Sequence, residues 1–187
     1  MAISNAFKNQ IENRNFLSPI GFKFTLNKAP KTAFFSNSAS IPGLTLVNVV
    51  QPTYLKNIDL PGDKVEFSDF KLRFLVDEYV ENYMEIQNWI RGLGHPESLQ
   101  QTYNLQDSNP SLNQPIKSQL NLYSDGTLTV LTSNQNPHFY VKFSELYPYY
   151  LSDLEFDATD SDVQYFTAEA YFKYTAYDIV DVNGNPL

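Results

Sequence analysis

The chain has 187 residues, a formal net charge of −8 at pH 7 and no cysteine. This length fits one domain that can bury its own core. The missing cysteines exclude disulfides, CxxC redox pairs and cysteine–zinc sites. A protein that grips nucleic acid through its phosphates needs a basic face, so the acidic balance argues against that kind of binding.

Residues 1–17 read as an N-terminal arm that contains a short helix over 6–14, where Phe7 and Ile11 lie four apart. The charged-then-apolar pattern of a signal peptide is not seen there. No apolar run approaches the roughly 18 residues that cross a bilayer. We therefore expect neither export by the ordinary secretory route nor membrane insertion.

Three segments alternate apolar and polar residues with the period of a strand that has one buried face: 22–26, 70–76 and 139–143. An aromatic content of 15% favours β structure as well. Between the first two segments, residues 32–43 and 44–63 predict further strands, interrupted at Pro42-Gly43, Pro52 and Pro61-Gly62.

One amphipathic helix is predicted over 77–93, with an apolar stripe at spacings of four and three formed by Tyr79, Tyr83, Ile86, Ile90 and Leu93. Asp77 suits the N-cap, and Gly92, Gly94 and Pro96 end the helix. Residues 95–117 are polar and lack periodicity, and they predict an inserted loop.

Two β features follow in the C-terminal half. Asp125-Gly126, with Leu120 and Leu122 before it and Leu128 and Val130 after it, predicts a hairpin with a two-residue turn. Residues 164–180 alternate over their whole length, and as one strand they would span about 50 Å. Strands average about 5–6 residues, so this one is expected to extend beyond its own core unless a bend or bulge shortens it.

Motifs of catalysis and metal binding do not occur in the sequence. His95 and His138 have no partners at ligand spacing, and the acidic residues Asp157, Asp160 and Asp162 fail the EF-hand pattern. Glycine-rich phosphate loops and a GxSxG elbow are missing too. A carboxylate pair for glycoside hydrolysis stays open, because such pairs converge only in the fold. We expect no enzymatic activity, no cofactor and no metal.

Two blocks occur in an order that resembles a known family. The first has Ile41-Pro42, then Lys56-Asn57-Ile58, Pro61-Gly62-Asp63-Lys64, Phe67 with Asp69, and Asp77-Glu78 opening a helix that holds Trp89. The second has Leu146-Tyr147-Pro148, then Leu154-Glu155-Phe156-Asp157 and the long closing strand. Together they cover about half the chain and resemble the tail tube proteins of contractile-tailed, T-even-like bacteriophages.

This resemblance implies a single domain over 1–187, mainly β, an antiparallel sandwich or barrel with one flanking α-helix. It also implies hexameric rings in which inner strands of six copies close a barrel around a channel, and stacking of the rings into a tube. Viral DNA would be ejected through that tube without being bound specifically. The partners would be tail sheath and baseplate proteins, and the location would be the tail of the virion, assembled in the host cytoplasm.

Two sets of contact residues follow from that expectation. The segment 49–65 looks like a projecting hairpin that contacts the next ring, through Tyr54, Lys56, Asn57, Ile58, Pro61, Gly62 and Asp63. Tyrosines on the polar face of the last strand, namely Tyr165, Tyr171 and Tyr177, are predicted subunit contacts. Some of the surplus carboxylates are expected to line the channel and repel phosphates.

Other interpretations stay open at this stage. The polar segment after His95 and the end of the chain, DVNGNPL, do not match the family, which leaves a baseplate tube initiator as an alternative. The tube protein of type VI secretion shares the ring architecture. A monomeric β-sandwich that binds a carbohydrate or another ligand through its tyrosines is the alternative from a different class.

Overall fold

The computed structural model describes residues 16–94, 96–107, 122–156 and 165–187. Several predicted features lie outside these residues. They are the helix over 6–14, His95, Leu120, the acidic turn at 157–162, and the part of the polar segment from 108 onward.

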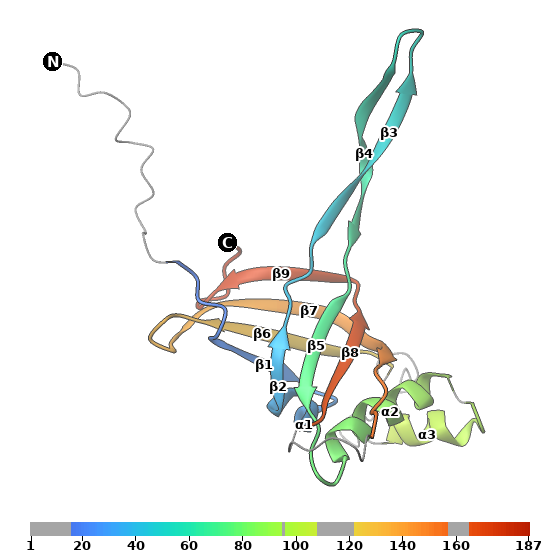
Figure 1. Cartoon of the computed structure of the whole chain (residues 1–187), viewed down its shortest axis with the longest axis vertical. Helices are drawn as coiled ribbons and strands as arrows, with labels where there is room; N and C mark the ends of the chain where they lie inside the picture. The colour runs from blue at the N-terminus through green and yellow to red at the C-terminus, as the bar shows by residue number, and fades with distance from the viewer. Residues whose placement is uncertain (1–15, 95, 108–121, 157–164) are drawn as a thin grey trace, which may run out of the picture.

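About half of the described chain is antiparallel β structure, and far less of it is helical (Figure 1), which confirms the predicted fold class. The main sheet has the order β1-β6-β7-β8-β5-β2, and β9 also pairs with β7. Its strands are β1 Phe22–Leu26, β2 Ser36–Ala39, β5 Phe70–Leu75, β6 Ser124–Leu131, β7 Pro137–Leu151, β8 Thr167–Lys173 and β9 Ala176–Asp181. A separate two-stranded sheet consists of β3 Leu44–Pro52 and β4 Asn57–Phe67. The helices are α1 Pro30–Phe34, α2 Glu81–Gly94 and α3 Gln100–Asp107.

The main sheet folds over on itself at a corner in β7. Residues 139–144 of this strand pair with β9, whereas residues 147–151 pair with β8. At the corner Glu145 has a φ of 55°, and the pairing with β6 shifts register there. A bulge of this kind bends a strand and lets it pass from one layer to the next.

The predicted continuous strand over 164–180 is wrong, because the chain bends at the same corner. Tyr174 and Thr175 separate β8 from β9, and the Thr175 N–H donates a hydrogen bond of 3.1 Å to the Ser144 carbonyl oxygen. Apolar alternation continues around the bend, so the pattern alone shows no break. The longest strand is instead β7, with 15 residues.

The core lies between the two halves of the folded sheet, and aromatic rings fill its centre. The Phe70 ring centroid is 5.0 Å from that of Phe24 and 4.6 Å from that of Phe143. Every apolar residue predicted to face inward in 24–26, 70–74 and 141–143 is at most 2% exposed. Burial of this extent is the main favourable term in folding, so the period-two pattern correctly located the core.

The predicted hairpin turn at Asp125-Gly126 is wrong, because both residues lie inside β6. Gly126 pairs with Leu26 on one side and Phe143 on the other. A Cβ at this position would lie 3.2 Å from Cζ of Phe24. The glycine therefore makes room for an aromatic ring and does not form a turn.

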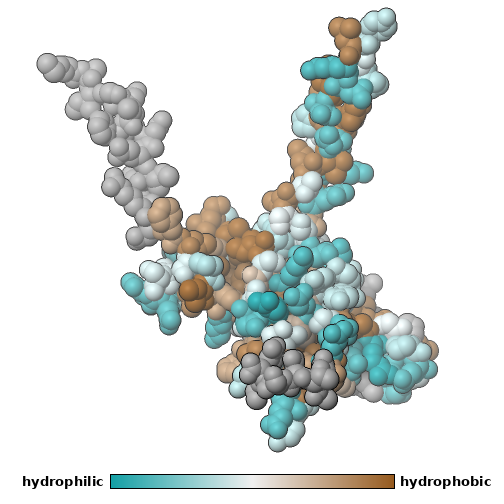
Figure 2. All heavy atoms as spheres, in the orientation of Figure 1, coloured by the Kyte–Doolittle hydropathy of each residue, from teal (hydrophilic) through white to brown (hydrophobic). Residues whose placement is uncertain are grey.

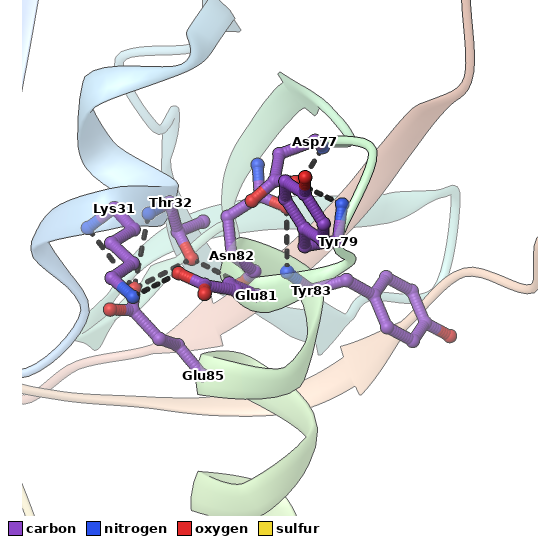
Figure 3. A network of polar contacts seen from close by, with 8 residues as sticks. All are labelled: Lys31, Thr32, Asp77, Tyr79, Glu81, Asn82, Tyr83 and Glu85. Carbon is purple, nitrogen blue, oxygen red and sulfur yellow. Dashed lines mark hydrogen bonds and ion pairs between the residues drawn. The ribbon is translucent and has the colours of Figure 1, made fainter.

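Part of the segment predicted as a strand over 32–43 is helical instead. Pro30 occupies the start of α1, a position where its missing N–H costs nothing. The Glu85 carboxylate, on α2, accepts hydrogen bonds of 3.1 Å from the backbone N–H groups of Lys31 and Thr32 (Figure 3). This cap for α1 comes from about 50 residues away, so no local pattern reveals it.

Helix α2 begins at Glu81, four residues later than predicted. Asp77 instead forms a turn in which its carboxylate accepts a hydrogen bond from the Tyr79 N–H (Figure 3). The fully buried Asn82 bonds three backbone groups of this turn at 2.6–3.2 Å. As a result Tyr79 is 81% exposed and does not belong to the buried stripe. Residues 100–107, predicted as loop, form helix α3.

Candidate assembly interface

Strands β3 and β4 form a two-stranded ribbon, residues 44–67, that projects from the body of the protein (Figure 1). Within the described residues the two strands pair only with each other, and none of their residues is buried. A lone two-stranded hairpin is marginally stable in water. A ribbon this long and this exposed therefore lacks a covering surface in the part of the chain that the structure describes.

The ribbon carries exposed apolar residues along its length. Residues directly opposite each other in an antiparallel pair share a face, and side chains alternate between the two faces along a strand. Near the body, Leu44 lies opposite Phe67 and Leu46 opposite Val65; nearer the tip, Val49 lies opposite Leu60, on the other face of the ribbon. Mixed pairs such as Thr45 with Glu66 lie between these apolar pairs. Figure 2 shows hydrophobic residues along the ribbon between hydrophilic ones.

A bulge divides the ribbon into these two parts. Pairing passes from Leu46–Val65 to Asn48–Pro61, so three residues of β4 face one residue of β3. A Cβ on Gly62 would lie 2.2 Å from the Val47 carbonyl oxygen, which no side chain can tolerate. The break predicted at Pro61-Gly62 is thus a bulge within β4.

Two tyrosines at the sheet corner anchor the base of the ribbon. The Phe67 ring lies 5.9 Å from Tyr174 and 5.8 Å from Tyr177, centroid to centroid. The Tyr174 hydroxyl donates to the Ser68 carbonyl oxygen at 2.7 Å, and the Tyr177 hydroxyl donates to that of Pro42 at 3.0 Å. Burial raises the pKa of Tyr174 to about 12. Both rings hold the ribbon within one copy, a role that the sequence did not reveal.

The predicted stacking residues all lie on the ribbon, in two groups. Tyr54 and Lys56 are at the exposed tip, where the Thr53 N–H donates to the Lys56 carbonyl oxygen at 3.1 Å. The remaining five are in β4, at its start or at the bulge: Asn57, Ile58, Pro61, Gly62 and Asp63. The projecting hairpin that the sequence predicts over 49–65 is therefore present, as part of the ribbon.

The predicted subunit-contact tyrosines have three different surroundings. Tyr165 precedes β8 and is 82% exposed. Tyr171 lies on the solvent-facing side of β8, with its ring centroid 5.0 Å from that of Tyr150 and its hydroxyl donating to Glu169 at 3.1 Å. Tyr177 is engaged at the base of the ribbon, as described above.

The main sheet also has strand edges without a partner. Among the described residues, β2 pairs only with β5, and residues 147–151 of β7 pair only with β8. Unpaired edges are templates for another strand. The half-sheet β2-β5-β8-β7 can therefore accept a strand on both sides.

In the part of the chain that the structure describes, no cluster of three or more His, Asp or Glu side chains has the arrangement of a metal site. Within the same residues, no helix is long and apolar enough to cross a membrane.

Comparisons with known proteins find a likeness in structure and none in sequence. No protein-family model and no curated protein sequence matches the chain. A chain of the anti-feeding prophage tube-terminating cap superposes with a TM-score of 0.56 at 15% identity, covering 97% of this chain and all of that one (100%). A chain of the anti-feeding prophage baseplate gives a TM-score of 0.55 at 15% identity, over 93% and 97% of the two chains.

A chain of the PVC sheath–tube complex, from an extracellular contractile injection system, has a TM-score of 0.54 at 15% identity and covers 90% and 94%. The protein has the contractile-tail tube fold. The similar chains are matched over nearly their whole length. The resemblance noted in the sequence is confirmed at the level of the fold.

Proposed function

We propose that this protein is a structural subunit of the tube of a contractile tail, and that copies of it form rings that stack around a channel. The observation that carries the proposal is the uncovered ribbon. Its exposed apolar residues, among them Leu44, Leu46, Val49, Leu60 and Val65, each 42–59% exposed, form a surface too extensive to remain in water. A second copy of the chain provides the cover.

The proposal includes the finer features that the resemblance implies. Rings are hexameric, the ribbon with Tyr54 to Asp63 contacts the next ring, and sheath and baseplate proteins bind the finished tube. The similar chains come from a sheath–tube complex, a baseplate and a cap, which supports these partner classes. In a bacteriophage the tube belongs to the tail of the virion, is assembled in the host cytoplasm, and conducts viral DNA.

A second candidate is a tube component of a non-viral contractile injection system, including a tube initiator at the baseplate. The specific observation in its favour is that the similar chains come from an extracellular injection system and the anti-feeding prophage. The two candidates share the assembly and differ in the cargo. A monomeric ligand-binding sandwich is the competing class, and its tyrosines would bind a small molecule.

Size-exclusion chromatography followed by negative-stain microscopy tests the proposal. The purified chain is expected to form rings or tubes as its concentration rises, and end-on class averages should show six-fold symmetry. A single monomer peak at every concentration, without particles in micrographs, would contradict the proposed function and favour the monomeric class.

A further inference from the structure

The half-sheet that carries the ribbon has two different faces. It consists of β2, β5, β8 and residues 147–151 of β7, and the ribbon connects β2 to β5 (Figure 1). Its inner face is buried completely or nearly so, through Phe70, Leu72, Phe74, Ala168, Ala170 and Phe172. The opposite side, which we call the open face, presents Asp69, Lys71, Arg73, Glu169, Tyr171 and Lys173, together with Tyr149 and Tyr150 from β7.

The first group of charges on the open face is compensated internally. Nζ of Lys173 lies 2.5 Å from a carboxylate oxygen of Asp69, and the Tyr149 hydroxyl donates to the other oxygen of Asp69 at 2.5 Å. The same lysine lies 5.2 Å above the Tyr149 ring. Charge-assisted hydrogen bonds and cation–π contacts hold both charges against partners on their own face.

The charges of the second group contact neutral partners on the same face. Nζ of Lys71 lies 5.3 Å above the Tyr171 ring, whose hydroxyl donates to Glu169 at 3.1 Å. Arg73 donates from Nε to the Asn37 side-chain oxygen at 3.4 Å. The five charged residues of the open face thus all interact with neighbours on that face.

The charge of the open face differs from that of the whole chain. Counting the described residues, three cations and two carboxylates give this face a net charge of +1, whereas the chain carries −8. The described residues of this face therefore do not carry the acidic surplus. The expectation that an acidic balance marks the channel wall does not fit this face.

Geometry indicates which face turns toward a channel. Both edges of the half-sheet lack a partner among the described residues, so identical copies can join edge to edge and close into a barrel. Strands β1, β6 and β9 and helix α2 lie on the buried side. A closed barrel has more room outside than inside, so this bulky layer belongs on the outside.

We propose that the open face lines the channel of the assembled tube, and that the wall is charge-balanced and rich in tyrosine instead of acidic. The inference rests on the proposed tube function. Fixed ion pairs have weaker fields than isolated charges, and salt screens them further. A polyanion passing along such a wall is neither repelled at the entrance nor held by a row of free cations.

Site-specific labelling tests the position of the face, because the chain has no cysteine of its own. Lys71→Cys and Thr167→Cys place a thiol on the open face, and Asn88→Cys places one on the exposed side of α2. Assembled tubes are treated with biotin–maleimide and then with streptavidin–gold. We expect gold along the sides of Asn88→Cys tubes, and only at the ends of tubes of the other two variants.

The outcomes separate this inference from the proposed function. Gold along the sides of Lys71→Cys or Thr167→Cys tubes would overturn the wall assignment while leaving tube formation intact. A wild-type chain that forms no tubes would overturn the proposed function, and the wall assignment with it. Labelling after dissociation of the tubes should be equal for all three variants, which controls for thiol reactivity.

A charge change tests the balance of the wall. Glu169→Lys and Glu78→Lys alter the chain charge equally, but only the first lies on the open face. Wild-type tubes should retain little of a fluorescent single-stranded oligonucleotide on sedimentation. Glu169→Lys tubes should retain several-fold more than Glu78→Lys tubes, and added salt should abolish the difference. Equal retention by the two variants would contradict the inference.

Discussion

At the scale of single residues, the open face is organised by Asp69. The hydrogen bond from Lys173 lowers the pKa of the Asp69 carboxyl most, and the Tyr149 hydroxyl contributes next. The same bond to Asp69 raises the pKa of Tyr149 to about 12. One carboxylate therefore binds a cation and a phenol at once, which fixes side chains from three segments of the half-sheet.

The variant Tyr149→Phe should raise the pKa of Asp69 toward its ordinary value, because the carboxylate loses one donor. A depressed carboxyl pKa contributes stability above the unfolded value of about 3.9, and this contribution is lost as pH falls through the folded value. The variant should therefore be less stable than wild type near neutrality and equally stable in strong acid. Carboxyl ¹³C NMR measures the pKa, and urea unfolding measures the stability.

Tyr150→Phe is the matched control, since the Tyr150 ring lies against Tyr171 and its hydroxyl is not the donor to Asp69. An Asp69 pKa that is unchanged in Tyr149→Phe would show that the lysine alone holds the carboxylate.

Lys28 gives a pH dependence of the same sign, but in the alkaline range. Burial lowers its pKa to about 8, although the amine lies 5.1 Å from the Trp89 ring, which favours the charged form. In the unfolded chain a lysine titrates near 10.4, so the unfolded state binds more protons between about pH 8 and 10.4. Stability should rise with pH in that window.

In Lys28→Met this rise should disappear, because the residue no longer titrates. Urea unfolding at several pH values from 7 to 10 measures the slope of stability against pH. Lys23→Met, at an exposed position of β1, is the control and should keep the wild-type slope. An identical slope in Lys28→Met and wild type would contradict the expectation.

At the scale of elements, sequence patterns located the strands but not their corners. Alternation identified β1, β5 and the central part of β7, because each has one buried face. It could not show that β7 bends at Glu145, or that a carboxylate from Glu85 makes residues 30–34 helical. Both features depend on contacts between residues distant in sequence.

The candidate site was predictable to a similar degree. Prolines and short apolar runs predicted a projecting hairpin over 49–65, and the ribbon is there. The cross-strand pairing of its apolar residues was not predictable, because the bulge at Gly62 shifts the register between its two parts. The anchoring role of Tyr177 depends on the bend before β9, which the continuous alternation concealed.

Gly62→Ala should damage the ribbon and leave the body intact. The new Cβ would meet the Val47 carbonyl oxygen at 2.2 Å, so the bulge must open and the two parts of the ribbon must shift relative to each other. Tube yield in a sedimentation assay should fall strongly. Unfolding of the body, followed by the fluorescence of the single buried Trp89, should change by less than about 0.5 kcal/mol, since the ribbon contributes little to the core.

Gly94→Ala is the control for this change, because a Cβ at the end of α2 meets nothing within 4 Å. A tube yield in Gly62→Ala equal to that of wild type would show that the bulge at Gly62 has no part in assembly. A large loss of body stability would show that the ribbon and the core are coupled more closely than their contacts indicate.

At the scale of the whole molecule, two kinds of surface are unsatisfied, and they lie in different places. The free edges of β2 and of residues 147–151 belong to the body, whereas the uncovered apolar residues belong to the ribbon. Copies that join edge to edge around a ring supply partners for the free strand edges. Copies that stack on the ring cover the ribbon. Separate surfaces of this kind predict two separable steps of assembly.

Deletion of residues 54–61 tests whether these steps are separable. It removes the tip and the outer apolar pair partners Ile58 and Leu60, but it leaves both strand edges and the base anchor at Phe67 unchanged. We expect rings that no longer stack, so micrographs should show single rings and no tubes, with Trp89 fluorescence as in wild type. Tubes of unchanged length would mean that ring stacking uses another surface. Monomers with an intact body would mean that the ribbon also joins neighbours within a ring, because the free strand edges alone would then be too weak to close it.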